Sequence, residues 1–206
     1  MADYKDYGWE DGATDAHGYL YPTLLQMLAS YKHSRILDVG CGNGVIAGRL
    51  LAEGFDVYGI DASESGITIA NEKHPGRFFV QDISSEKLPE ALAAMQFGVV
   101  ISTEVVEHIY APRTYMKFLR NALSPHGILI ISTPYHGYFK NLVLALTNKM
   151  DKHFTVLWDG GHIKFWSRLT LSTLLKEFNF EVIQFKGSGR LPFLWKSMFI
   201  SARLVA

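Results

Sequence analysis

Short runs of β-branched and apolar residues alternate with helix-like stretches along most of this chain. The runs are nearly continuous in apolar residues, which is typical of strands buried on both faces of a parallel sheet. This alternation predicts an α/β fold with a doubly wound, mostly parallel sheet. The predicted strands cover residues 35–39, 55–60, 78–80, 97–102, 128–132, 180–186 and 197–204, and the predicted helices cover 45–53, 63–73, 86–95, 113–123 and 169–178.

Two segments fall outside the alternation. Residues 1–33 are rich in aromatic residues and then helical over 20–31, so we expect an N-terminal cap at one end of the sheet. Residues 134–167 form an insertion after the fifth strand, with an amphipathic helix predicted over 138–150. The apolar residues that share one face of that helix are Phe139, Leu142, Val143 and Leu146. Repeats and interdomain linkers are absent from the sequence, so residues 1–206 are predicted to form a single domain.

Composition excludes several classes of protein. The 20 basic and 20 acidic residues give a formal net charge of zero, which lacks the overall electrostatic footprint of a nucleic-acid binder. The single cysteine, Cys41, excludes an internal disulfide and fits a reducing compartment. The acidic first 15 residues do not resemble a signal peptide, so a cytoplasmic location is expected. The basic residues from Lys186 onward leave membrane-surface contact open, although a buried last strand would equally explain their apolar neighbours.

A glycine-rich turn joins the first predicted strand to the next helix. Its glycines are Gly40, Gly42 and Gly44. Glycine permits a tight turn and a close approach of the backbone to a ligand, and amides at a helix start meet polar or anionic ligand atoms. The spacing is GxGxG with Val45 next, so the third glycine of the dinucleotide pattern is missing. A nicotinamide-dependent oxidoreductase is therefore disfavoured, although it stays open.

Carboxylates occur at the ends of three successive predicted strands. These ends meet at one edge of the sheet, where open α/β folds bind ligands. Asp38 lies two residues before Gly40, where it would accept a bond from a ligand ammonium or orient the loop. Asp61 is placed to bind both hydroxyls of a ribose. Asp82, with Ile83 after it, suits an adenine amino group beside an apolar wall.

The ordered motifs LDVGCGNG, YGIDAS, VQDI and STEVVEH resemble those of the class I S-adenosylmethionine-dependent methyltransferases, across about residues 35–134. The resemblance implies S-adenosyl-L-methionine as the cofactor and a Rossmann-like sheet of seven strands. It also implies that the cofactor contacts Asp38, Gly40, Gly42, Asn43, Gly44, Asp61, Ala62, Asp82, Ile83 and Thr103.

The stretch EVVEH, residues 104–108, follows the fourth predicted strand. In a helical turn Glu104 would share a face with Glu107 and His108. The stretch is similar to an E-x-x-E-H segment of the ubiquinone-pathway O-methyltransferases, and this resemblance implies a divalent-metal site, with Mg²⁺ expected, at Glu104, Glu107 and His108. The alternative is that the carboxylates cap a helix and that the histidine is a packing residue.

A second histidine segment, GGHIKFWS, ends the insertion. Similar segments occur in the quinol methyltransferases and in related enzymes acting on sugars and natural products. His108 and His162 are accordingly the candidate catalytic residues, as a general base or as a hydrogen-bond partner of the acceptor. The alternative for His162 is a structural histidine that ties down the insertion.

Together these features predict methyl transfer to a hydroxyl oxygen of a small molecule, with a quinol or catechol favoured. Sugar or natural-product acceptors and C- or N-methylation stay open, as does a non-catalytic partner subunit that keeps the fold. The Asn/Asp-Pro-Pro-Tyr motif of nucleic-acid N-methyltransferases is absent after the fourth predicted strand, where Ser102, Thr103, Glu104 and Val105 stand. No nucleic-acid partner is therefore expected.

Overall fold

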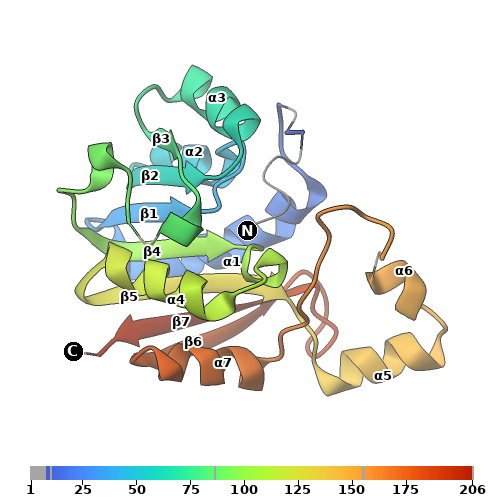
Figure 1. Cartoon of the computed structure of the whole chain (residues 1–206). Coiled ribbons are helices and arrows are strands. Elements are labelled where there is room, and N and C mark those ends of the chain that lie inside the picture. Colours follow the sequence, from blue (N-terminus) through green and yellow to red (C-terminus); the bar gives the residue numbers. More distant parts are fainter. Residues whose placement is uncertain (1–7, 10, 86, 155, 206) are drawn as a thin grey trace.

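A seven-stranded sheet forms the centre of the protein. The computed structural model describes residues 8–9, 11–85, 87–154 and 156–205. The strand order is β3-β2-β1-β4-β5-β7-β6, and β1 to β5 pair in parallel while β7 runs antiparallel to β5 and β6 (Figure 1). The strands are β1 Arg35–Val39, β2 Asp56–Asp61, β3 Phe78–Val80, β4 Phe97–Thr103, β5 Leu123–Pro134, β6 Phe180–Ser188 and β7 Ser197–Leu204. This arrangement confirms the predicted doubly wound, mostly parallel sheet.

Helices cover both faces of the sheet, which explains why the strands are apolar on both sides. Alternate strand residues point to opposite faces. Ile36 packs in the cluster that contains residues of α1, α2 and α3, whereas its neighbour Leu37 packs in the cluster that contains residues of α4 and α7. The helices are α1 Asp15–Leu28, α2 Val45–Ala52, α3 Glu64–Lys73, α4 Pro112–Ala122, α5 Tyr138–Leu146, α6 Met150–Phe154 and α7 Arg168–Glu177.

Local residue chemistry sets several helix boundaries. Gly54, with φ 83°, follows α2 and allows the chain to turn toward β2. Pro112 occupies the first turn of α4, where a missing N–H costs little. The hydroxyl of Ser167 accepts a hydrogen bond from the Thr170 amide at 3.2 Å and so caps α7. These boundaries fix where the loops at the strand ends begin.

The helix predicted over residues 86–95 is wrong. The described part of that segment contains a single turn of 3-10 helix, Glu90–Leu92, and a second such turn, Ile83–Ser85, precedes it. Pro89 lies in the middle of the predicted helix, where a proline removes a backbone donor and clashes with the preceding turn. Leu92 is fully buried and anchors the short turn to the core.

The insertion and the cap also differ in detail from the predicted helices. The predicted helix 138–150 is divided into α5 and α6, with Asn148 between them in a left-handed conformation, φ 53°. The N-terminal helix begins at Asp15 rather than at residue 20, and residues 1–7 and 10 of the predicted cap lie outside the described residues. In Figure 1, α5 and α6 stand beside the body of the sheet, apart from the helices that cover its faces.

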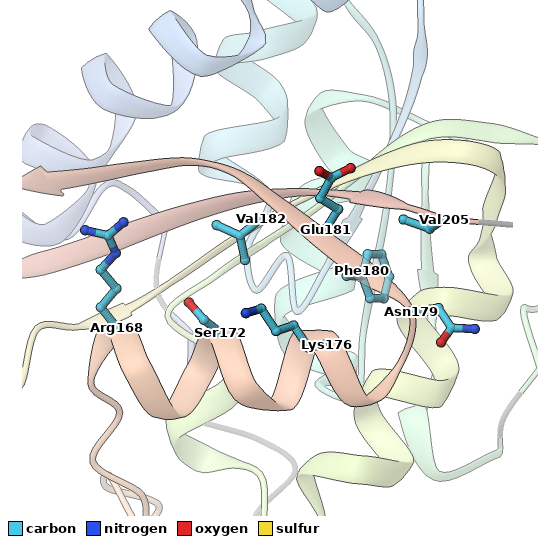
Figure 2. A pocket seen from close by; sticks show the side chains of 8 residues that line it. All are labelled: Arg168, Ser172, Lys176, Asn179, Phe180, Glu181, Val182 and Val205. Atoms are coloured by element: carbon cyan, nitrogen blue, oxygen red, sulfur yellow. The ribbon is translucent and has the colours of Figure 1, made fainter.

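The outer surface of the molecule carries a groove at the edge of the sheet. A shallow groove lies between α7 and the edge strand β6, lined by Arg168, Ser172 and Lys176 from the helix and by Glu181 and Val182 from the strand (Figure 2). Because β4, β5 and β7 lie between β6 and β1 in the sheet, this groove is remote from the glycine loop after β1.

The C-terminal tail contains β7, whose apolar side chains are buried in the sheet. Membrane contact by this tail stays a prediction. Among the described residues no helix is long and apolar enough to cross a membrane.

Candidate active site

The glycine loop between β1 and α2 adopts a conformation that only glycine tolerates well. Gly40, Gly42 and Gly44 have φ of 78°, 53° and 73°. A Cβ at Gly40 would lie 2.4 Å from Cγ2 of Val105, and one at Gly42 would lie 2.5 Å from the Trp9 ring. The three glycines are therefore required by the packing of the loop itself, besides any approach of a ligand.

Asp61 joins the end of β2 to the glycine loop. Its Oδ2 accepts a hydrogen bond from the Gly42 amide and its Oδ1 accepts one from the Ser63 amide, both at 2.8 Å. Each carboxylate oxygen has two lone pairs, so this side chain can accept ribose hydroxyls in addition to the two amides. Ala62 lies between Asp61 and Ser63, and its contact with adenine stays a prediction.

Asp38 is a buried carboxylate that forms no ion pair with any cation in the described part of the chain. The residue is 1% exposed, and its Oδ1 has no hydrogen-bond partner in the described part of the chain. Burial, followed by the negative charge of Asp61, raises the pKa of Asp38 to about 8. A ligand ammonium placed here would supply both a hydrogen-bond donor and the missing positive charge. The site therefore fits the amino-acid end of the predicted cofactor.

The remaining predicted cofactor residues lie at the same strand ends. Asp82 follows β3, and its Oδ1 accepts a hydrogen bond from the Ser84 amide at 2.9 Å. Ile83 packs against the apolar core, and Thr103 is the last residue of β4. Asn43 is buried and donates from Nδ2 to the Gly12 carbonyl at 3.0 Å, so it also holds the N-terminal segment on the loop. The predicted set is therefore gathered at the carboxyl ends of β1 to β4.

Glu104 is held by serine hydroxyls from two strands of the sheet. Its Oε1 accepts from the Ser132 hydroxyl at 2.7 Å, and its Oε2 accepts from the Ser197 hydroxyl at 2.8 Å. Its backbone has φ 55°, an uncommon conformation for a residue with a side chain that is often found at functional sites. Burial raises the pKa of Glu104 to about 7. The sequence did not single out the two serines, which stand at the end of one predicted strand, 128–132, and at the start of another, 197–204.

A second group of side chains lies next to this carboxylate. Ligand-type atoms of Glu107, His108 and His162 all lie within 4.8 Å of one another. Nε2 of His162 is 3.9 Å from Oε1 of Glu107, and the rings of His108 and His162 have centroids 4.9 Å apart. The structure thus brings the two candidate catalytic histidines together with Glu107. Glu104, which the sequence placed in the metal site, is not a member of this group.

Backbone hydrogen bonds bring the two distant histidine segments together. The amides of Ile163 and Lys164 both donate to the Glu107 carbonyl at 3.0 Å, and the Trp166 indole donates to the Val106 carbonyl at 3.2 Å. These bonds clamp the end of the insertion onto the 3-10 turn Val106–His108. Because the bonds use backbone atoms and a tryptophan, the sequence alone gives no signal for this pairing.

The protonation of the group follows from its surroundings. Nδ1 of His108 is 2.8 Å from the Gly160 carbonyl oxygen, which can only accept, so Nδ1 carries the hydrogen and Nε2 is the basic nitrogen. Burial, followed by the charges of His108 and His153, lowers the pKa of His162 to about 4. Burial and the charge of Glu104 raise the pKa of Glu107, which is 1% exposed and whose carboxylate oxygens lack a hydrogen-bond partner among the described residues.

Comparison with known proteins identifies the family. The model of a family described as a methyltransferase domain matches residues 14–185. The chain belongs to this family. Among curated relatives, the ubiquinone biosynthesis O-methyltransferase of Roseobacter denitrificans is 32% identical over 171 residues, which is 80% of this chain and 67% of the relative. A protein of the same name from Cereibacter sphaeroides is 37% identical over 171 residues, again 80% of this chain and 67% of the relative.

Solved structures agree with this methyltransferase fold. The magnesium protoporphyrin IX methyltransferase of Synechocystis, solved with bound S-adenosylhomocysteine, has a TM-score of 0.69 at 17% identity and covers 94% of this chain and 90% of its own. The chain is therefore an S-adenosylmethionine-dependent methyltransferase, and the oxidoreductase that its glycine loop left open is excluded. The donor set at Asp38 and Asp61 fits this cofactor.

Proposed function

We propose that this methyltransferase acts on a hydroxyl oxygen of a small quinol-like or catechol-like molecule. The observation that carries the proposal is the group of Glu107, His108 and His162 at the cofactor end of the sheet. A phenolic hydroxyl has a pKa near 10 and keeps its proton at neutral pH, so oxygen methylation benefits from groups that remove it. The names of the curated relatives, ubiquinone biosynthesis O-methyltransferases, support the same acceptor class.

The roles of the residues follow from the geometry. S-adenosylmethionine, when bound, supplies a sulfonium methyl group that is already activated for displacement. Asp61 would bind the ribose and Asp38 the ammonium, and together they fix where the methyl lies. Nε2 of His108, whose Nδ1 is held by Gly160, would accept the proton of the acceptor hydroxyl. His162, also neutral at pH 7, is the second candidate for this proton.

The same group fits a divalent cation. A buried carboxylate without hydrogen-bond partners in the described residues and two neutral imidazoles are suitable donors. Such a set, with two nitrogens and one oxygen, favours Zn²⁺, Mn²⁺ or Fe²⁺ over Mg²⁺, which prefers oxygen ligands. Glu107, His108 and His162 would hold the ion, which would lower the pKa of a nearby hydroxyl. Mg²⁺ stays the prediction from the sequence, and the metal content of the protein tests it.

The test uses the purified protein, S-adenosylmethionine and a panel of catechols and quinols. We expect methyl transfer to oxygen, with Glu107→Gln and His108→Gln each lowering kcat at least tenfold while S-adenosylmethionine affinity stays within twofold. Glu72→Gln and His33→Gln are the matched controls, because both residues are exposed. Activity lost in chelator and restored by one divalent ion would support the metal, and full activity in chelator would leave the histidines as the bases.

The alternatives predict different products. If a sugar or natural-product hydroxyl is the acceptor, the phenol panel stays unmethylated while the protein binds S-adenosylmethionine normally. C- or N-methylation would be recognised by the position of the new methyl group in the nuclear magnetic resonance spectrum of the product. Unchanged turnover in both Glu107→Gln and His108→Gln would overturn the proposed roles of these residues.

A further inference from the structure

Lys140 is a buried lysine on the amphipathic helix α5. It is 7% exposed, whereas the apolar residues Tyr138, Phe139 and Leu146 of the same helix are 84%, 52% and 77% exposed. Among the described residues its ammonium makes one hydrogen bond, to the Lys196 carbonyl at 3.4 Å, and it has no carboxylate within 4.0 Å. An ammonium has three N–H donors, and an unpaired buried charge is costly. Within the described residues, the ammonium therefore has no directly paired carboxylate.

Other basic side chains lie near enough to this lysine for their charges to act on one another. The His136 ring, in a residue that is 8% exposed, has its centroid 5.4 Å from that of His153. The charge of Lys140 acts on both rings, and the charge of Arg190, from the β6–β7 connection, acts on Lys140. Nε2 of His153 has no hydrogen-bond partner in the described part of the chain. The cluster thus combines two cations with two imidazoles, which offer N–H donors.

The electrostatics of the cluster favour an anion. Burial and the charge of Arg190 lower the pKa of Lys140 to about 8, and burial followed by the charge of Lys140 lowers the pKa of His136 to about 4. The charge of Glu104 acts on Lys140 in the opposite direction and raises its pKa, but Glu104 forms no ion pair with Lys140 within 4.0 Å among the described residues. An added anion would relieve the repulsion among the basic groups.

This cluster continues the wall of the candidate active site. Lys196, whose carbonyl holds Lys140, is followed by Ser197, which donates to Glu104. On the other side, the charge of His153 reaches His162, which is 3.9 Å from Glu107. Aromatic rings also border the cluster, since Phe154 lies parallel to the His136 ring at 6.1 Å and Phe165 lies edge-on at 5.1 Å. These rings offer a surface for an aromatic acceptor.

We propose that Lys140 and Arg190, together with His136 and His153, form a subsite for a carboxylate carried by the methyl acceptor. The inference rests on the proposed function, because it places the carboxylate of a dihydroxy-aromatic acid here while its hydroxyl meets Glu107, His108 and His162. A carboxylate has two oxygens that can accept from the Lys140 ammonium and from an imidazole N–H together. Lys140 is thus a specificity-determining residue for an acidic acceptor.

The test compares two ligands of equal shape. Calorimetry with the protein saturated in S-adenosylhomocysteine measures the binding of 3,4-dihydroxybenzoate and of 3,4-dihydroxybenzamide. We expect the acid to bind at least about tenfold more tightly, as a charge-assisted bond to a buried ammonium provides. Lys140→Met should abolish this preference, and Lys140→Arg should keep part of it. Lys149→Met is the matched control, because Lys149 is exposed and should leave the preference intact.

Folding is checked independently by S-adenosylhomocysteine affinity, which should be unchanged in every variant. Equal binding of acid and amide, a preference that survives Lys140→Met, or no binding of either ligand at millimolar concentration would overturn the subsite. Because binding needs no turnover, a Lys140-dependent preference in a protein that methylates no phenol would leave the subsite standing and contradict the proposed function. A preference transferred to a phenyl phosphate would mean that the subsite takes phosphate instead of carboxylate.

Discussion

A single side chain, Asp61, anchors the glycine loop and is also placed to bind the ribose. Its carboxylate accepts from the Gly42 and Ser63 amides at 2.8 Å and also has lone pairs for the ribose. We expect Asp61→Asn to weaken S-adenosylmethionine binding at least tenfold, because charge-assisted bonds of about 1.5–3 kcal/mol each are lost. The asparagine NH2 also cannot accept from one of the two loop amides, which adds to the effect. Calorimetry measures this effect on protein shown to be folded by circular dichroism.

The control for Asp61 lies on the same strand. Asp56 begins β2 and pairs with Arg35 and Arg77, at the end of the strand away from the glycine loop. Asp56→Asn should leave cofactor affinity within twofold of wild type. If Asp61→Asn bound S-adenosylmethionine as well as Asp56→Asn does, the ribose role of Asp61 would be wrong and its two amide bonds would be its whole function.

The sequence identifies candidate site residues where they lie at the ends of consecutive strands. Asp38 and Asp61 lie at the ends of β1 and β2, and the glycine loop and Asp82 follow β1 and β3, so the order of the strands places them at one edge. His162 was named as a candidate, but its pairing with Glu107 depends on backbone bonds across more than fifty residues, which leave no sequence pattern. Glu104 shows the same limit, because the serines that hold it come from β5 and β7.

At the scale of elements, the sheet strands could be predicted, whereas the outer segments could be predicted only in part. Strands such as β1 and β4 are buried on both faces, so their apolar runs report their position directly. The stretch around Pro89 has helical periodicity, but the proline has no backbone N–H to donate within a helix. In α5 the hydrophobic pattern predicted where the helix begins but neither its end nor its orientation, since the helix stops at Leu146, Lys140 is buried and Leu146 is exposed.

The insertion gives the prediction at this scale. If α5 covers the acceptor, as its buried Lys140 beside the active-site wall suggests, its amides should exchange faster in the protein alone than with S-adenosylhomocysteine and acceptor bound. Hydrogen exchange followed by mass spectrometry on peptides covering residues 138–154 measures the difference. The β7 strand serves as the internal reference, because it is paired on both sides and should be protected in both states.

Strong and equal protection of α5 in both states would make it part of the fixed core and remove its role as a lid. Protection gained with S-adenosylhomocysteine alone would instead couple α5 to the cofactor site. The division of the insertion at Asn148, in its left-handed conformation, is the position where a hinge between α5 and α6 would be expected.

The stability of the whole molecule should depend on pH through the cofactor site. The pKa of Asp38 is raised from 3.8 to about 8, so the folded protein without ligand keeps a proton that the unfolded chain releases above about pH 4. The stabilisation linked to that proton is present below pH 4 and is lost as the pH rises toward 8. Other buried groups also titrate, so the difference between wild type and Asp38→Asn isolates this contribution.

The variant Asp38→Asn should therefore have a higher Tm than wild type at pH 8 without ligand, and the gap should narrow toward pH 5. Ligand should narrow this gap at pH 8. S-adenosylhomocysteine at one hundred times its Kd adds about 2.7 kcal/mol of stability, which raises Tm by about 5–11 °C in a protein of 206 residues. Asp38→Asn should show a much smaller rise, because the ligand ammonium loses its charged partner. If Tm depended on pH identically in the two proteins and rose equally with ligand, Asp38 would neither bind the ammonium nor destabilise the ligand-free protein at pH 8.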